Sequence, residues 1–310
     1  MADTSARTAG SEVIPSGFSD SRVKVSGRNE EAPWNRFDPD CYAAMHYAEL
    51  YEGDRQILEI VRKFFALYLT PDTSLRGIDV GTGANLYPAL TQLPWCRSIT
   101  LYEHSTSNTV WLGEQVQKHA PMWDRFWEVL SDGPDGKPYR DAKNTEDRTR
   151  LRDTATVLPG NLFDLPDLPP ESKWDLGTMM FVAESLSSEY REFDNAVGAF
   201  TGALHPGSPF AVALMRHSTG YRVGKQHFPA YSVGEGEVYK AFEHRVDPGT
   251  FRMHSICLPK PATDEGGADG GAADSDVTLP VSAADGGAAL EGDGSEDVFK
   301  GMILVCGHTR

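Results

Sequence analysis

Short apolar runs alternate along most of the chain with segments in which apolar residues recur at helical spacing. The first such segment carries Ile57, Val61 and Phe64 on one face and stops near Pro71, so it predicts a helix. The same reasoning predicts strands at 75–80, 98–102, 155–158, 175–181 and 210–215, and helices at 84–93, 105–119, 189–204 and 234–243. Strands that alternate with helices indicate an α/β fold, a doubly wound and mostly parallel sheet with helices on both faces.

The C-terminal part departs from this alternation. Strands are predicted at 251–258 and 301–307 with no helix between them, which indicates an antiparallel edge on the parallel sheet. Residues 262–297 between these strands are rich in Gly, Ala and Asp and are expected to form a disordered acidic loop.

Two further segments interrupt or precede the regular pattern. Residues 1–32 lack periodicity and are expected to be a flexible tail. Residues 120–153 contain a short aromatic helix, a turn-rich stretch and a charged stretch, and they form an insertion. One domain is therefore expected over 33–310, beginning with a lid and a helix over 33–70.

The chain of 310 residues carries a formal net charge of −16. Ten acidic residues and no lysine or arginine lie between Pro261 and Phe299, so much of this charge belongs to the acidic loop. An acidic surface argues against nucleic acid and against an anionic membrane, because both attract basic proteins. No apolar run approaches the length of a membrane span, and the four cysteines are isolated in sequence. We therefore expect a cytoplasmic protein that acts as a monomer or homodimer.

The clearest chemical signal is Gly81-Thr82-Gly83 at the end of a predicted strand. Glycines in this position let a ligand approach the backbone. Glu103, at the tip of the next strand, is placed to accept hydrogen bonds from both ribose hydroxyls of an adenosine. Two glycines after a strand also form ordinary turns, and this motif alone leaves both interpretations open.

NAD and S-adenosylmethionine both use such a site, and two residues favour the second. The dinucleotide motif has a third glycine where this chain has Leu86, and that glycine allows close helix packing beneath a pyrophosphate. Asp79 would repel a pyrophosphate, but it can organise backbone and water around the ammonium and sulfonium of S-adenosylmethionine. No cluster of His, Asp or Glu suggests a metal site.

Several motifs in order along the chain resemble the nicotinamide, phenylethanolamine and indolethylamine N-methyltransferase family. The likeness begins at Phe37-Asp38-Pro39 and runs toward the C-terminus. The matching positions are Tyr42, Tyr47, Asp79 to Gly83, Tyr87, Glu103, Asn108 and the segment Ser218 to Phe228. The resemblance implies a class I methyltransferase domain with a Rossmann-like sheet, an N-terminal helical lid and S-adenosylmethionine as cofactor.

The resemblance also implies roles for single residues. Tyr42 and Tyr47 would belong to a lid over the cofactor, although ordinary packing of a terminal helix explains them as well. The other implied contacts are Gly81, Gly83 and Tyr87 with the methionine part, Glu103 and Asn108 with the ribose and adenosine, and Asn161 and Leu162 with the adenine. Asn161 stands where the family usually carries an acid.

The substrate side departs from the family. Arg216 and His217 follow the fifth strand, where the family carries an acid that positions the substrate. This basic pair argues against nicotinamide and against a simple ammonium group, unless both residues are merely solvated at the strand end. Arg216 is a candidate anchor for a carboxylate or carbonyl, and His217 or Glu184 is a candidate base. Candidate aromatic walls are Phe181, Tyr221 and Phe228.

The sequence therefore favours a methyltransferase that acts on a small aromatic or heteroaromatic acceptor, with nitrogen as the favoured methyl-accepting atom. Carbon or oxygen methylation of an indole-like or phenolic compound of secondary metabolism is the main alternative. A non-catalytic ligand-binding module and an NAD-dependent oxidoreductase are the remaining interpretations.

Overall fold

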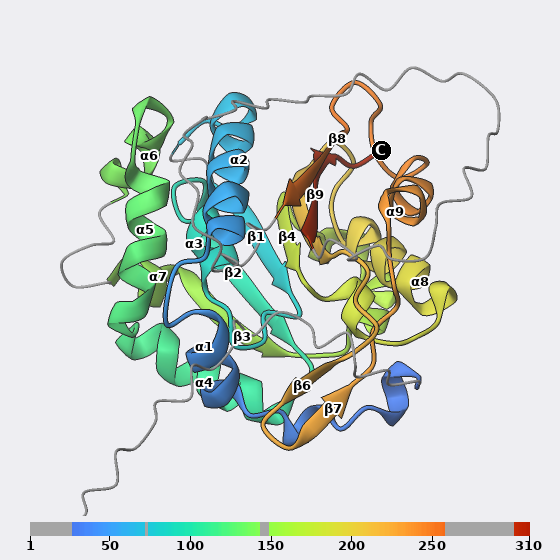
Figure 1. The fold of residues 1–310 in the computed structure, drawn as a ribbon. Helices are drawn as coiled ribbons and strands as arrows, with labels where there is room; N and C mark the ends of the chain where they lie inside the picture. Colours follow the sequence, from blue (N-terminus) through green and yellow to red (C-terminus); the bar gives the residue numbers. More distant parts are fainter. Residues whose placement is uncertain (1–26, 72–73, 143–148, 258–300) are drawn as a thin grey trace, which may run out of the picture.

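The computed structural model describes residues 27–71, 74–142, 149–257 and 301–310 (Figure 1). Its main sheet has seven strands in the order β3-β2-β1-β4-β5-β9-β8. The five strands from β3 to β5 in this order are parallel, and β9 is antiparallel to both β5 and β8. The predicted α/β sheet with an antiparallel C-terminal edge is confirmed.

The elements have the following bounds. The strands are β1 (Leu75–Val80), β2 (Cys96–Glu103), β3 (Ala155–Pro159), β4 (Leu176–Met180), β5 (Pro209–Met215), β6 (Tyr221–Val223), β7 (Gln226–Phe228), β8 (Arg252–Cys257) and β9 (Gly301–His308). The α-helices are α1 (Pro39–His46), α2 (Glu52–Tyr68), α3 (Tyr87–Gln92), α4 (Thr106–Lys118), α5 (Asp124–Ser131), α6 (Lys137–Asp141), α7 (Thr149–Thr154), α8 (Tyr190–Gly202) and α9 (Glu235–Phe242). The short 3-10 helices are η1 (Asn29–Glu31), η2 (Trp34–Arg36), η3 (Pro121–Trp123), η4 (Pro134–Gly136), η5 (Leu162–Asp167), η6 (Pro170–Ser172) and η7 (Ala183–Ser185).

Helices cover both faces of the sheet (Figure 1). One face packs against α2, α3 and α4, and the other packs against α8 and α9. The chain passes through β1, β2 and β3 toward one edge and then through β4 and β5 toward the other, so the winding reverses between β1 and β4. Doubly wound sheets bind ligands at the carboxyl ends of the strands at this reversal.

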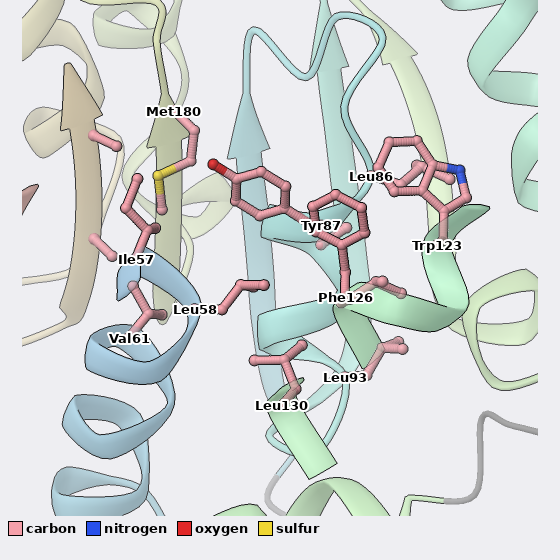
Figure 2. Packing of buried hydrophobic residues seen from close by; sticks show 14 of the residues in the cluster. Ile57, Leu58, Val61, Leu86, Tyr87, Leu93, Trp123, Phe126, Leu130 and Met180 are labelled. Atoms are coloured by element: carbon pink, nitrogen blue, oxygen red, sulfur yellow. The ribbon is translucent and has the colours of Figure 1, made fainter. Parts of the chain in front are cut away.

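The aromatic helix that the sequence predicts after residue 120 is α5, and it packs against the start of α3. Phe126 stacks on Tyr87 with ring centroids 5.4 Å apart and ring planes 9° from parallel. Trp123 contacts Phe126 at 5.4 Å. Figure 2 shows the Tyr87 hydroxyl directed away from Phe126 and toward Met180, which ends β4. The insertion therefore supports the chain at the carboxyl edge of β1 and β4.

The structure differs from the predicted elements in three places. The helix expected from residue 84 begins at Tyr87, because the preceding residues continue the turn and Asn85 Oδ1 accepts a hydrogen bond from the Tyr87 N–H at 3.1 Å. The β6–β7 hairpin was not predicted. Residues 27–32, assigned to the tail, belong to the described part, and the Gly27 N–H donates to Ser188 Oγ at 3.1 Å. The rest of the tail and the acidic loop 262–297 lie outside the described residues.

The packing of α5 on α3 generates a stability prediction. Phe126→Ala removes a fully buried ring and leaves a cavity beside Tyr87, so we expect the free energy of unfolding to fall by about 3–5 kcal/mol. Val110→Ala is the control, since Val110 is 62% exposed and its replacement should change stability by less than about 0.5 kcal/mol. Chemical denaturation measures both variants, and similar small effects would contradict the packing argument.

Candidate functional site

A cavity of about 750 Å³ lies at the carboxyl ends of the parallel strands. Its walls come from the turn after β1, the ends of β2, β4 and β5, the loop after β3, and the N-terminal segment with α1. The lining includes the sequence-predicted residues Tyr42, Tyr47, Gly81, Gly83, Glu103, Asn108, Asn161, Leu162, Phe181, Glu184 and Tyr221. The sequence-predicted residues that lie outside the lining are Asp79, Tyr87, Arg216, His217 and Phe228.

The turn after β1 requires glycine at both of its predicted positions. Gly81 and Gly83 have φ values of 65° and 57°, in the left-handed region that glycine adopts without strain. A Cβ on Gly81 would also lie only 2.7 Å from Val182, which follows β4. The turn can therefore be tight and keep its backbone open to the cavity.

Glu103 is held at the end of β2 by three donors. Its Oε2 accepts from the Gly83 N–H at 2.8 Å, and its Oε1 accepts from the Ser105 N–H at 2.7 Å and from Asn108 Nδ2 at 3.4 Å. Burial raises the pKa of the Glu103 carboxyl, and these donors oppose that rise. The network fixes the carboxylate at the cavity wall and ties β2 to the glycine turn.

Asn161 and Leu162 line the cavity after β3. The Asn161 side-chain oxygen already accepts a hydrogen bond from the Phe163 N–H at 3.1 Å, where it caps η5. From the sequence, an acceptor for an adenine amino group is expected at this position. The geometry leaves the amide nitrogen of Asn161 as its free donor.

Asp79 lies beneath the glycine turn and not in the cavity. Its carboxylate is 1% exposed and accepts from Thr178 Oγ1 at 2.6 Å. Burial raises its pKa to about 7. The neighbours Ile78 and Val80 face the core under α8 and α9, so Asp79 faces the opposite layer. The structure gives Asp79 a role in supporting the turn and does not support direct contact with a cofactor.

Tyr87 also lies behind the cavity wall. It is fully buried between Phe126 and Tyr47, and its ring meets the Tyr47 ring edge-on at 5.9 Å. The direct contact with a cofactor that the resemblance implies is therefore not seen in the lining. Tyr87 instead holds Tyr47, which does line the cavity.

The N-terminal segment spans the cavity and is tied down on both sides. Ser105 Oγ, at the start of α4, donates to the Trp34 carbonyl at 2.7 Å. On the other side, the Asn29 N–H donates to a Glu192 carboxylate oxygen of α8 at 2.9 Å. Tyr42 and Tyr47 follow on this segment and line the cavity, so the geometry brings them to the site as the resemblance implies.

Two lining residues were missed in the sequence-based assignment. Asp54, in the first turn of α2, is 3% exposed, and burial raises its pKa to about 7. His46 packs against Tyr42 with ring centroids 4.3 Å apart, and burial lowers its pKa to about 4. A signal for Asp54 was present, because this acid stands on the apolar stripe of α2, three residues before Ile57.

Glu184 is a buried carboxyl that faces the cavity from η7, directly after β4. It is 1% exposed, and its Oε1 accepts from the Met215 N–H at 2.7 Å. Its Oε2 finds no hydrogen-bond partner among the described residues. Burial raises the pKa of this carboxyl to about 8. A carboxyl with one oxygen fixed and the other free can accept a proton from a ligand.

Aromatic rings form a layered wall on this side of the cavity. Tyr221 stacks on Phe228 at 5.2 Å, and Phe228 stacks on Trp34 at 5.1 Å. Tyr221 and Trp34 line the cavity, whereas Phe228 is fully buried between them. Phe228 is thus a support for the wall, which corrects its assignment as a substrate contact. Phe181 lines the cavity with a strained φ of 61°.

Arg216 and His217 do not reach the cavity. Residues of β5 alternate between the two faces, and Met215 points to the cavity side while Arg216 points to the α9 side. Arg216 forms an ion pair with Glu235 of α9 at 3.3 Å, and the His217 N–H donates to the Val233 carbonyl at 2.9 Å. The sequence-based assignment of these two residues to substrate binding and proton transfer is therefore not supported.

The described ranges contain no group of three or more His, Cys, Asp or Glu side chains arranged to hold a metal ion. Among the helices that the structure describes, none is both long and apolar enough to cross a membrane.

Solved structures with a similar fold include several methyltransferases. The N-methyltransferase NodS from Bradyrhizobium japonicum WM9, in complex with S-adenosylhomocysteine, is 8% identical over 84% of this chain and 88% of its own, with a TM-score of 0.38. An S-adenosylmethionine-dependent methyltransferase from Clostridium acetobutylicum is 10% identical over 87% of this chain and 96% of its own, with a TM-score of 0.42. The [4+2]-cyclase SpnF is 14% identical over 70% of each chain, with a TM-score of 0.40.

Sequence comparison gives a sharper result. No curated protein sequence matches the chain significantly. The family model of the NNMT/PNMT/TEMT family, in contrast, matches residues 28–251, which include the glycine turn, Glu103, Glu184 and the β6–β7 hairpin. The chain therefore belongs to the NNMT/PNMT/TEMT family and is an S-adenosylmethionine-dependent methyltransferase.

Proposed function

We propose that this methyltransferase transfers the methyl group to a nitrogen atom of a small aromatic or heteroaromatic acceptor. The observation that carries the proposal is Glu184, whose unpaired carboxylate oxygen is buried at the cavity between aromatic side chains. A cavity of about 750 Å³ falls within the range of small-molecule sites, which supports a small acceptor.

The residues at the other end of the cavity fit the cofactor. The glycine turn keeps its backbone accessible, and the buried Asn108 Oδ1 has no hydrogen-bond partner among the described residues. Glu103 and Asn108 would hold the ribose, Asn161 and Leu162 would contact the adenine, and Gly81, Gly83, Tyr42 and Tyr47 would surround the methionine part. Bound S-adenosylmethionine supplies a methyl group on a positively charged sulfur.

Glu184 would then act on the acceptor. The nitrogen lone pair forms the new N–C bond as the methyl–sulfur bond breaks, and the nitrogen gives up its proton to the free Glu184 oxygen. A pKa of about 8 suits this role, because a base works best when its pKa lies near the operating pH. Met215 fixes the other carboxylate oxygen and so orients the base.

The lining also bears on the class of acceptor. The argument against amine and nicotinamide acceptors rested on Arg216 and His217, and that argument falls because neither residue lines the cavity. The acidic group that remains is Glu184, and the aromatic residues Phe181 and Tyr221 line the same space. Aromatic faces favour a neighbouring cation, and a carboxylate favours an N–H or ammonium group. Together they support a nitrogen acceptor with a flat apolar body.

The proposed ribose contact predicts a binding defect. Glu103→Gln replaces a charged acceptor with a neutral amide, so we expect affinity for S-adenosylhomocysteine to fall about ten- to a hundredfold. Calorimetry at neutral pH measures the change, and melting temperature checks that the network of Glu103 is intact. Glu114→Gln, an exposed substitution on α4, is the control. Unchanged affinity in Glu103→Gln would rule out the ribose assignment.

The role of Glu184 predicts a loss of turnover with binding preserved. In Glu184→Gln we expect kcat to fall by about 10²–10⁴-fold, while affinity for S-adenosylhomocysteine stays within about threefold. Only the ionised carboxylate accepts a proton, so kcat/KM of the wild type should rise with pH up to about 8, and the variant should lose this rise. His217→Asn is the matched control and should turn over normally. A product methylated on carbon or oxygen, or normal turnover by Glu184→Gln, contradicts the proposal.

A further inference from the structure

Asp54 is a buried acid of the cavity to which neither the resemblance nor the proposed chemistry gives a role. It is the third residue of α2, lies 3% exposed, and lines the cavity together with Tyr42 and Tyr47 of the N-terminal segment. The Tyr87 hydroxyl approaches it from α3 and, as a hydrogen-bond donor, lowers the pKa of the Asp54 carboxyl. Figure 2 shows that this hydroxyl points toward Met180, which also lines the cavity.

No positive side chain balances this carboxyl. Within the described ranges, no lysine, arginine or histidine forms an ion pair with Asp54, and Arg55 beside it pairs with the exposed Glu52 at 3.5 Å. Desolvation raises the pKa of Asp54 to about 7, and the groups that surround it are tyrosines. A buried carboxylate without a cation is costly, so such a group persists mainly where a ligand or a function requires it.

The position of Asp54 relates it to the reacting end of the cofactor. Its charge and the charge of Glu184 both raise the pKa of Tyr42, so this ring lies within electrostatic reach of both acids. Glu103 and Asn161 occupy the opposite wall, at the ends of β2 and β3. Asp54 thus belongs to the part of the cavity between the adenosine contacts and Glu184, where the methyl group must pass.

We propose that Asp54 is the counter-ion for the positive charge at the methionine end of the cofactor and makes the site prefer S-adenosylmethionine over S-adenosylhomocysteine. The two molecules differ by one methyl group and by the charge on sulfur. A carboxylate in a poorly solvated cavity stabilises the charged sulfonium and gives nothing to the neutral thioether. The same charge difference favours release of the product after transfer.

The test compares ligands that differ in this charge and needs no acceptor. Dissociation constants are measured by calorimetry for S-adenosylmethionine, for S-adenosylhomocysteine and for sinefungin, an analogue with an amine in place of the sulfonium. In Asp54→Asn we expect affinity for the two cationic ligands to fall about tenfold and affinity for S-adenosylhomocysteine to change less than about threefold. Retained binding of S-adenosylhomocysteine itself shows that the site is folded.

Two further variants sharpen the result. Glu52→Gln removes an acid from the exposed side of the same helical turn and should leave all three constants unchanged. Asp54→Glu keeps the charge and should keep the preference for the cationic ligands. The proposal is overturned if Asp54→Asn weakens the three ligands equally, if it weakens none of them, or if Glu52→Gln reproduces its effect.

Discussion

The burial of three carboxyl groups in one cavity is the constraint on which the site depends. Asp54, Glu103 and Glu184 are all less than a tenth exposed, and burial raises the pKa of each. Removing a carboxylate from water is costly unless hydrogen bonds or opposite charges replace the lost hydration. Glu103 receives three donors, Glu184 receives one, and Asp54 has the Tyr87 hydroxyl beside it. The degree of compensation therefore follows the proposed role of each residue, from a preformed ribose contact to groups that await a ligand.

The fold supplies this arrangement from parts that are distant in sequence. Glu103 and Glu184 stand after β2 and β4, strands that lie on either side of β1, so the sheet brings them to one edge. Asp54 enters from α2 and is positioned by packing, since Phe126 of α5 holds Tyr87 and Tyr87 holds Tyr47. The N-terminal segment then closes the space between α4 and α8. The charged groups are rigid because the elements that carry them are anchored in the two cores.

Sequence reasoning succeeded where a local pattern determines the structure. The strand, glycine turn and Glu103 form a short motif whose geometry follows from β1–α3–β2, and the parallel sheet follows from the alternation of elements. It failed where the outcome depends on which face a residue takes. Arg216 follows Met215 on β5, and a shift of one residue carries it to α9 and Glu235. Asp79, Tyr87 and Phe228 lie one layer behind the wall, and Asp54 reaches it only through tertiary packing, which no single segment reveals.

The central claim is that one cavity is divided, with the cofactor between the glycine turn and Asp54 and the acceptor space at Glu184. A crystal structure of the protein with S-adenosylhomocysteine tests this division most directly. The account predicts the ribose hydroxyls on Glu103, the ligand sulfur between Tyr42 and Asp54, and an aromatic-walled space left open beside the free oxygen of Glu184. A ligand bound outside this cavity, or one bound inside it that fills the space at Glu184 with its adenine, would contradict the account.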